Sequence, residues 1–338
     1  MRRIATTVLW VFLAILLLLT ALLTWFSWQA SSREQQSRHE AAPQTGQFVQ
    51  AGDLELFVQE MGPQTGPPVL FIHGTGAWSE MWRGPMTALA AAGYHAFAID
   101  IPPFGFSEKP YEPRYSTEDQ ARRIVAVARH LGLSDLTLVG HSFGCRATVD
   151  AAVHLIDRMR ALVLIDAAVG ITLDNTPPAP PGMVSRVAAG MLAIPSVRKT
   201  LVASTVTNPL LTRRLFQLLI DDPEDATDQL VTMLQRPLVV RDSTVRLSEW
   251  LQVFLFGDDA AALSSRPVTY RTFAPPTLLL WGEKDQLTPL SLAHQLEGLL
   301  PDPSLVILKG VGHIPQVEDE RQFTDALLRF LATTVQVP

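Results

Sequence analysis

The chain has only one cysteine, Cys145, among its 338 residues. A single cysteine cannot form an intrachain disulfide, so the stability of the fold cannot depend on one in any cellular compartment. An unpaired cysteine that is buried where a helix packs behaves as a small apolar side chain, and we expect Cys145 to have that role.

Charged residues are also scarce, at 18% of the chain, and the net charge is only −6. The 27 lysines and arginines are scattered, which excludes the basic surface of a nucleic-acid-binding protein. Apolar residues make up 47% of the chain, which excludes a mainly disordered protein. Only one stretch reaches the roughly 20 apolar residues that a membrane span requires, so several spans are excluded as well.

That stretch comprises residues 4–26, which contain neither a charge nor a proline. At about 1.5 Å of rise per residue, a helix of this length extends roughly 34 Å, enough to cross the hydrocarbon core of a bilayer. Trp25 and Trp28 lie where an interfacial belt of aromatic residues is expected. We therefore predict a membrane anchor at 1–30, with membrane lipid as the partner of residues 4–26.

The topology follows from Arg2 and Arg3, which favour a cytoplasmic N-terminus. The remainder of the chain is then expected on the non-cytoplasmic side, periplasmic or extracellular. The alternative is a cleaved signal peptide, which would have a shorter apolar run of about 7 to 15 residues and a small-x-small cleavage site. Residues 27–30 supply such a site poorly, and the anchor is the preferred interpretation.

The segments that follow predict an α/β fold with a mostly parallel sheet and helices on both faces. Residues 31–46 are polar and without period, which predicts a linker. Strands at 48–50 and 54–60 flank Gly52 and indicate a hairpin. Beyond them, short apolar runs alternate with helical segments. The runs lie at 69–72, 95–99, 136–139, 162–165, 277–281 and 305–308, and the helical candidates at 81–92, 117–131, 143–156, 289–300 and 317–333.

One interval, 168–268, breaks this alternation. It begins with the proline-rich residues 175–181 and then places Leu, Val and Met at helical spacing. About a hundred residues between two strands are too many for a loop. We predict a helical cap over the mouth of the sheet, built partly from 184–194 and 209–220. The core then comprises 47–167 and 269–338.

Residues 140–144 have the sequence Gly-His-Ser-Phe-Gly, a G-x-S-x-G motif, between an apolar run and a helical segment. A strand before this motif and a helix after it form a nucleophile elbow, in which the glycines relieve crowding and the serine hydroxyl projects at the helix N-terminus. Ser142 is therefore the predicted nucleophile. The alternative is a structural turn with an incidental serine.

A serine hydroxyl is a weak nucleophile until a neighbouring imidazole takes its proton. His313 follows the last apolar run, so we expect it in a loop at the C-terminal end of a strand, where ligands gather in open α/β sheets. Five other histidines lie in the linker or in and beside predicted helices and strands, and His141 lies in the elbow; all are assigned to surface or packing. His313 is the predicted base.

The imidazole needs a carboxylate that fixes its tautomer and stabilises its protonated form. Two aspartates follow apolar runs at the required edge of the sheet, Asp285 after 277–281 and Asp166 after 162–165. Asp285 precedes His313 by one helix and one strand, which gives the chain order Ser, acid, His. We predict Asp285 as the acid and keep Asp166 as the alternative, which could instead cap the start of the cap segment.

Acyl transfer also needs hydrogen-bond donors for the developing oxyanion. The segment His73-Gly-Thr-Gly ends the strand at 69–72, and Gly74 and Gly76 allow the backbone to approach a substrate closely. The backbone N–H of Phe143 is the first predicted donor, and that of Thr75 or Gly76 is the second.

Together these segments resemble the α/β-hydrolase fold family, in particular its capped subgroup of esterases, carbon–carbon bond hydrolases and related serine hydrolases. The likeness covers about residues 47–335 and implies the fold and a triad, but little about the substrate. Epoxide hydrolases and haloalkane dehalogenases of the same subgroup attack with an aspartate where this chain has Ser142. The matching segments are 73–76, 100–107, 140–144, 281–285 and 312–313.

The resemblance implies acyl chemistry: hydrolysis of a carboxylic ester or thioester through an acyl-enzyme on Ser142. No metal or organic cofactor is implied, and a membrane anchor suits a lipophilic acyl substrate. The first alternative is a carbon–carbon bond hydrolase of a diketone or dienoate, whose carboxylate would need an arginine. Arg146 is expected to lie too deep for that role. The second alternative is a non-catalytic binding protein on the same fold.

Overall fold

The computed structural model describes residues 2–171, 183–257, 259 and 261–334. Its centre is an eight-stranded sheet with the strand order β1-β2-β4-β3-β5-β6-β7-β8. The hairpin strands β1 and β2 run antiparallel, and the strands from β4 to β8 pair in parallel. The strands are β1 (Gly46–Ala51), β2 (Leu54–Met61), β3 (Pro68–Ile72), β4 (His95–Ile99), β5 (Leu136–His141), β6 (Met159–Ile165), β7 (Thr277–Gly282) and β8 (Pro303–Leu308).

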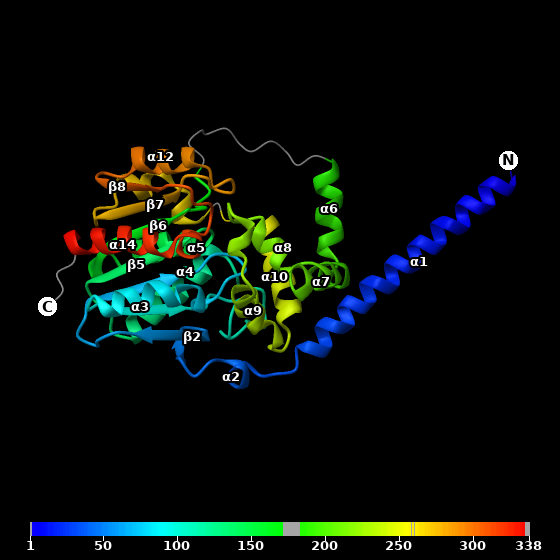
Figure 1. The fold of residues 1–338 in the computed structure, drawn as a ribbon, viewed down its shortest axis with the longest axis horizontal. Coiled ribbons are helices and arrows are strands. Elements are labelled where there is room, and N and C mark those ends of the chain that lie inside the picture. The colour runs from blue at the N-terminus through cyan, green and yellow to red at the C-terminus, as the bar shows by residue number, and fades with distance from the viewer. Residues whose placement is uncertain (1, 172–182, 258, 260, 335–338) are drawn as a thin grey trace.

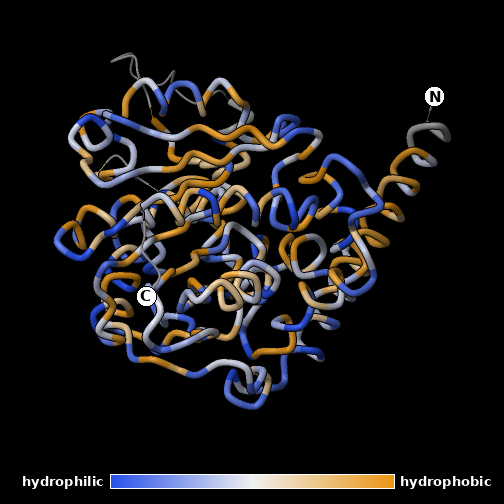
Figure 2. The backbone as a smooth tube through the Cα atoms, turned by 60° about the vertical axis from the view of Figure 1, so that its left-hand side comes forward, coloured by the Kyte–Doolittle hydropathy of each residue, from blue (hydrophilic) through white to orange (hydrophobic). Residues whose placement is uncertain are grey.

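The central strands are mostly apolar because helices cover both faces of the sheet and keep these strands away from water. Every residue of β4, β5 and β7 is buried. One face packs on α4 (Thr117–His130), α5 (Gly144–His154) and α12 (Leu290–Leu299), and the other on α3 (Arg83–Ala91) and α14 (Glu320–Thr334). Figure 2 shows the apolar stretches concentrated in these strands and along α1. The predicted fold class is confirmed.

The helical insertion lies between β6 and β7. Residues predicted at 184–194 form α6 (Met183–Ala193), and those predicted at 209–220 form α8 (Pro209–Gln217). The predicted proline-rich start at 175–181 lies outside the described residues. Helices α7 (Pro195–Ser204), α9 (Asp228–Gln235), α10 (Ser243–Phe256) and α11 (Pro267–Arg271) complete the insertion among the described residues.

Helix α10 covers the carboxyl ends of the central strands. The ring of Trp250 lies 5.9 Å from that of Phe143, directly after β5, and 4.9 Å from that of Phe104, in the loop after β4. These aromatic contacts fix the insertion over the mouth of the sheet, because each ring is largely removed from water.

The N-terminal helix α1 (Arg2–Arg33) projects away from the folded body (Figure 1). Within its residues Thr6–Arg33, an 18-residue window has a mean hydropathy of 2.6, and by length and composition this part of the helix could cross a membrane. The hydroxyls of Thr20 and Thr24 donate to the carbonyl oxygens of Leu16 and Thr20, which satisfies both polar groups within the helix.

Residues 31–46, predicted as a linker, connect α1 to the sheet and are held against the insertion. Helix α1 continues to Arg33, and the next residues are held by the insertion: Arg33 Nε donates to Leu238 O at 3.1 Å, and Glu34 Oε1 accepts from Thr244 N at 3.1 Å. A short helix, α2 (Arg38–Ala41), follows with Ser37 as its N-cap. Polar residues without a period give no sign of such contacts in the sequence, because the partners come from residues about 200 positions away.

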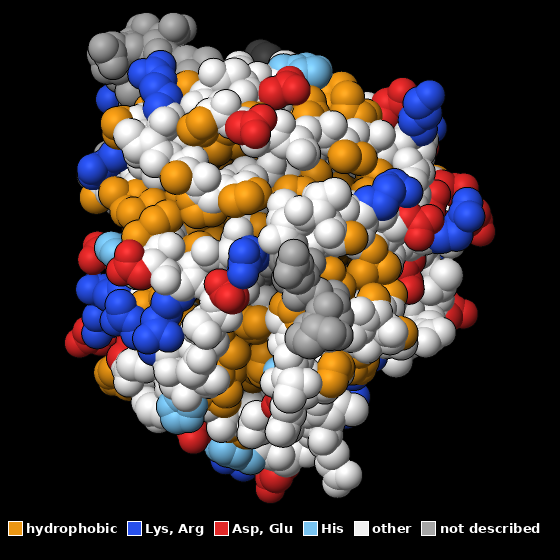
Figure 3. All heavy atoms as spheres, turned by 90° about the vertical axis from the view of Figure 1, so that its left-hand side faces the viewer, with side chains coloured by type: hydrophobic (Ala, Val, Ile, Leu, Met, Phe, Trp, Pro, Cys, Tyr) orange, Lys and Arg blue, Asp and Glu red, His pale blue; other side chains and the backbone are white. Residues whose placement is uncertain are grey.

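The face of the body that points away from α1 carries basic and acidic side chains side by side, interrupted by apolar groups (Figure 3). Mixed charges of this kind do not create the one-signed potential that attracts a polyanion. The charges on this face are therefore as scattered as the lysines and arginines are along the sequence.

Candidate active site

Ser142 lies at the tip of a sharp turn between β5 and α5, with a backbone φ of 53°. A Cβ on Gly140 would lie 2.5 Å from Thr148 Oγ1, and one on Gly144 would lie 2.3 Å from the carbonyl oxygen of His73. Glycine is therefore required on both sides of Ser142, where the strand and helix cross closely. The positive φ at a non-glycine residue is the backbone strain that often marks functional turns.

Three predicted side chains come together at this turn. The hydroxyl of Ser142 lies 2.8 Å from Nε2 of His313, and Nδ1 of the same ring lies 2.7 Å from Oδ2 of Asp285. His313 is 2% exposed and Asp285 is 7% exposed, so water competes little for these hydrogen bonds. An imidazole placed between a hydroxyl and a carboxylate can take the hydroxyl proton while the carboxylate stabilises the resulting cation.

Asp285 is held in place by the loop that follows it. The backbone N–H groups of Leu287 and Thr288 donate to Oδ1 at 2.7 and 3.0 Å, and the Thr288 hydroxyl donates to Oδ2. Burial raises the pKa of Asp285, but the hydrogen bonds from His313 and Thr288 outweigh it and leave the pKa below its usual value. Asp285 is therefore a carboxylate at neutral pH.

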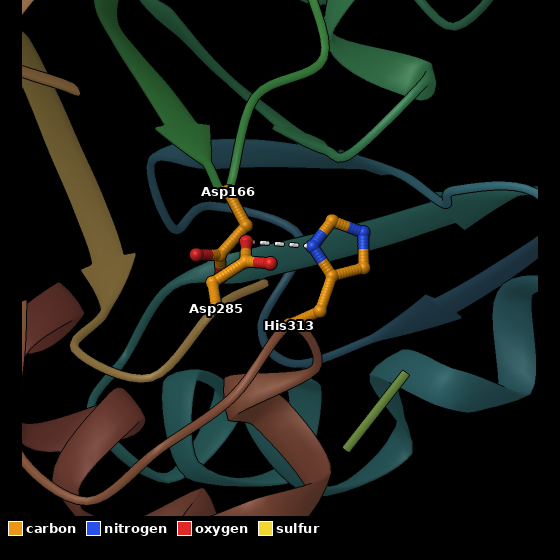
Figure 4. A group of neighbouring side chains, drawn as sticks. All are labelled: Asp166, Asp285 and His313. Atoms are coloured by element: carbon orange, nitrogen blue, oxygen red, sulfur yellow. Dashed lines mark hydrogen bonds and ion pairs between the residues drawn. The ribbon is translucent and has the colours of Figure 1, made fainter. Parts of the chain in front are cut away.

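Asp166, the alternative acid, lies beside Asp285 at the end of β6, with its Oδ1 accepting from the N–H of Gly282 at 2.9 Å. Figure 4 shows the two carboxyl groups next to each other, with the dashed hydrogen bond of His313 leading to Asp285. Complete burial and the negative charge of Asp285 raise the pKa of Asp166 well above its usual value. Both effects favour the protonated form of Asp166 over its anion.

The same three residues have the spacing of a cation site, since one ligand atom of each lies within 4.8 Å of the others. Both ring nitrogens of His313 are already engaged, with Ser142 and Asp285, and a metal would have to displace one of these bonds. A proton held by Asp166 relieves the repulsion between the two carboxyl groups equally well. The arrangement fits proton transfer better than metal binding.

Two further histidines hold the backbone around the site. The ring of His141 donates from Nε2 to the carbonyl oxygen of His313 at 2.8 Å, and burial together with the charge of His313 lowers its pKa to about 3. His73 accepts from the N–H of Ile101 at 2.9 Å and lies 2.8 Å from the carbonyl oxygen of Gly74, with its pKa lowered by burial to about 4. Both rings stay neutral. Sequence reasoning treated His141 only as packing, because its contact lies 172 residues away.

The predicted oxyanion donors lie around Ser142. Thr75, Gly76 and Phe143 line the same cavity as the serine, and a Cβ on Gly74 would lie 2.9 Å from the Cβ of Ser142. In the part of the chain that the structure describes, the backbone N–H groups of Thr75, Gly76 and Phe143 donate to no other protein group. They are free to bind an oxygen atom of a substrate.

The cavity above Ser142 has a volume of about 590 Å³ and a mostly apolar wall. Its apolar lining comes largely from the insertion and includes Val206, Leu215, Phe216, Leu218, Leu219, Leu234, Leu238, Leu247 and Phe254. A cavity of this size and lining accommodates a medium-sized apolar ligand with a few polar groups.

The prediction that Arg146 lies too deep to reach the cleft is wrong, because it forms part of the cavity wall. Helical side chains lean toward the helix N-terminus, so the long side chain of Arg146 reaches back toward Ser142. Its guanidinium stacks 5.5 Å from the Phe143 ring centre, donates to Ala168 O at 2.9 Å and pairs with Asp259 at 3.3 Å. The charge is thus balanced within the protein.

A family model described as alpha/beta hydrolase fold matches residues 67–320, most of the chain. The chain belongs to the α/β-hydrolase fold family. The homologues of this hydrolase include the 2-hydroxy-6-oxo-2,4-heptadienoate hydrolase of Pseudomonas putida, which is 26% identical over 85% of the chain and 96% of the relative. The haloalkane dehalogenase 2 of Mycobacterium tuberculosis is 28% identical over 78% of the chain and 87% of the relative.

Solved structures of other hydrolases have the same fold. A bacterial membrane phospholipase A covers 99% of both chains with a TM-score of 0.65 and 23% identity. The serine hydrolase CarC of carbazole degradation covers 85% of this chain and 98% of its own, with a TM-score of 0.67 and 23% identity. At these identities the likeness shows the fold, and the chemistry must be argued from the site.

Proposed function

We propose that this α/β-hydrolase is a membrane-anchored serine hydrolase that cleaves carboxylic esters or thioesters. The observation that carries the proposal is the hydrogen-bonded chain from Ser142 through His313 to Asp285, with separations of 2.8 and 2.7 Å. A buried serine at a glycine-flanked turn, in contact with an imidazole that a carboxylate orients, is the arrangement that activates a hydroxyl for acyl transfer.

In this proposal His313 takes the proton of Ser142 as its oxygen attacks the carbonyl carbon. The N–H of Phe143 and that of Thr75 or Gly76 stabilise the negative oxygen of the tetrahedral intermediate. His313 then gives the proton to the leaving alcohol or thiol, which departs and leaves an acyl-enzyme. A water molecule that His313 deprotonates hydrolyses this ester and restores Ser142.

The cavity supports a lipophilic acyl substrate. Its lining is apolar, and several of its residues, such as Leu218 at 79% exposure and Phe254 at 42%, continue onto the outer surface. A hydrocarbon chain gains about 0.8 kcal/mol for each methylene group that it buries. A longer acyl chain should therefore bind more tightly until the cavity is full.

We expect kcat/KM for p-nitrophenyl esters to rise several-fold for each two carbons added from acetate, and then to level off or fall. The gain comes from burial of methylene groups against the insertion. Initial rates with acetate, butyrate, hexanoate and octanoate esters measure it. A fluorophosphonate probe should label the folded wild type, and the absence of both labelling and ester hydrolysis would favour the non-catalytic alternative.

The second candidate is hydrolysis of a carbon–carbon bond, which the identity to the heptadienoate hydrolase of P. putida favours. A dienoate carboxylate would need a cation, and Arg146 is the only arginine or lysine that lines the described cavity. Because Asp259 already pairs with it, Arg146 is poorly suited to hold a second carboxylate. Faster turnover of a 2-hydroxy-6-oxo-dienoate than of every ester in the series would reverse this preference.

The contacts of α1 support an anchor over a cleaved signal peptide. Near its C-terminal end, Ser27 hydrogen-bonds Thr200 of α7 at 3.3 Å, and Ala30 is 1% exposed. Removal of residues 1–30 would expose this part of α7 to solvent. It would also remove most of the helix that leads into the segment around Glu34. A signal peptide is removed after export, so it is not expected to pack against the mature protein as α1 packs against α7.

We expect the full chain to sediment with membranes, to resist extraction by 1 M salt (a concentration at which the screening length is about 3 Å) and to be released only by detergent. Deletion of residues 1–30 should move most of the protein to the soluble fraction, because the apolar surface that holds it in lipid is lost. N-terminal sequencing of the membrane-bound protein is the control. A mature N-terminus beyond residue 26 would contradict the anchor.

A further inference from the structure

One polar side chain in the cavity wall is not used by the proposed chemistry. Gln316 lies in the short helix α13 (Pro315–Glu318), three residues after His313, and is 2% exposed. It lines the same cavity as Ser142. Both polar atoms of its amide, Nε2 and Oε1, are buried and have no hydrogen-bond partner in the described part of the protein.

A second unpartnered group belongs to the same wall. The hydroxyl of Thr212, on α8 of the insertion, is also buried without a partner among the described residues, and Thr212 lines the cavity. Helix α8 and the segment after His313 are in contact, because Phe216 and Ile314 pack in one apolar cluster. Two unpartnered polar side chains therefore occur where the insertion meets the loop of the catalytic histidine.

Buried polar groups are nearly always hydrogen-bonded, and an apolar side chain of similar size would avoid the cost of leaving them unpaired. Gln316 is shielded from bulk water, so a molecule that enters the cavity is the natural source of partners. The surrounding side chains, such as Phe216 and Leu219, are apolar and offer none. The amide thus indicates a recognition role rather than a packing role.

The chemistry of the two side chains selects the ligand. A primary amide donates from Nε2 and accepts at Oε1, and a threonine hydroxyl does both. A carboxylate or phosphate would only accept, would leave Oε1 unpaired, and would enter an apolar cavity whose one guanidinium, that of Arg146, is already paired with Asp259. A neutral hydroxyl can donate and accept at once and therefore satisfies the amide.

Resting on the proposed ester hydrolysis, we propose that Gln316, assisted by Thr212, binds a free hydroxyl on the alcohol half of the substrate. The alcohol half is indicated because the leaving group departs beside His313, from which α13 begins after two residues. The substrate class is then an acyl ester of a polyhydric alcohol that keeps at least one free hydroxyl, such as a partial ester of glycerol.

The first test uses only the wild-type full chain in detergent. Three laurate esters with the same acyl chain are compared: 1-lauroylglycerol, its di-O-methyl derivative and methyl laurate. We expect kcat/KM for 1-lauroylglycerol to exceed that for the di-O-methyl derivative by about tenfold or more, since sites built to hydrogen-bond a hydroxyl reject analogues that lack it. Equal values for these two esters would overturn the proposal.

The second test replaces Gln316 with methionine, which is close in size and apolar. The ratio of kcat/KM for 1-lauroylglycerol to that for the di-O-methyl derivative should fall toward one in Gln316→Met and fall partly in Thr212→Val. Gln316→Asn, which keeps the amide on a shorter stem, should restore part of the ratio. An unchanged ratio in Gln316→Met, or the same loss for both esters, would contradict a recognition role.

Fluorophosphonate labelling separates this proposal from the proposed function. Labelling of Ser142 depends on the triad and not on the alcohol, so it should proceed in the wild type and in the Gln316 variants. Absence of labelling in the wild type would refute serine hydrolysis itself. Normal labelling with no discrimination between the free and methylated esters would refute only the role of Gln316.

Discussion

Ser142→Ala should abolish covalent labelling by a fluorophosphonate probe and lower kcat for p-nitrophenyl butyrate by about 10³-fold to 10⁶-fold. Ser142 is the hydroxyl that contacts His313 at 2.8 Å, and without it no acyl-enzyme can form. Removal of a nucleophile usually leaves only the rate supplied by substrate binding and the oxyanion donors. Initial rates and gel fluorescence of the labelled protein measure the two effects.

A matched control is Ser264→Ala, which removes a buried serine hydroxyl that has no hydrogen-bond partner among the described residues and lies outside the cavity of Ser142. It should label and turn over as the wild type does. His313→Ala should retain Ser142 but react with the probe about 10³-fold more slowly, because the hydroxyl loses its base. Full labelling of Ser142→Ala would place the nucleophile elsewhere and contradict the assignment.

Asp285→Asn should lower kcat by about 10⁴-fold with little change in KM, whereas Asp166→Asn should lower it tenfold or less. Asp285 accepts from Nδ1 of His313 at 2.7 Å, and an amide there would turn the imidazole toward the wrong tautomer. Burial and Asp285 raise the pKa of Asp166 and so favour its protonated form, which an amide resembles in size and in lacking charge. Steady-state rates of both variants decide between the two acids.

Circular dichroism and thermal unfolding should show that both variants are folded. A large loss in Asp166→Asn together with a small loss in Asp285→Asn would reverse the assignment and make Asp166 the orienting acid. A large loss in both would indicate that the two carboxyl groups work as one hydrogen-bonded unit, since effects within such a unit do not add.

Much of the core could be predicted because buried parallel strands have a strong sequence signal. Residues 95–99 were predicted as a strand and form β4 with the same bounds, and five further apolar runs form β3, β5, β6, β7 and β8 with ends extended by one to three residues. Each is a short run of apolar residues bounded by turn formers, which few other structures produce.

The insertion was predicted only in part because its helices are short and depend on one another. Helix α7 opens with Pro195 after Ile194, which has no capping side chain, and it packs on α1 and α10 rather than on the sheet. Its apolar residues pack against more than one neighbouring helix, so the sequence shows no single amphipathic face. The proline-rich residues 175–181 indicate where the insertion begins, and they lie outside the described residues.

The details of the candidate site that sequence missed depend on the conformation of a loop and on a contact between distant segments. Thr288 supports Asp285 through its hydroxyl, but it belongs to no recognisable motif. His141 supports the backbone of His313 from a variable position of the G-x-S-x-G motif, which does not specify a histidine. Arg146 was misplaced because helical numbering gives the direction of a side chain only at Cβ and not at the end of a long stem.

The short and well-held connection between α1 and the body has a consequence for how the proposed enzyme would meet its substrate. Arg33, Glu34 and Gln36 each hydrogen-bond the insertion, so the catalytic domain has little slack with which to tumble or to rise from the lipid surface. An enzyme anchored in this way would meet its substrate by lateral diffusion in the membrane, with its active site at a fixed distance from the lipid surface. Its turnover would follow the mole fraction of substrate in the surrounding leaflet rather than the concentration in the bulk solution.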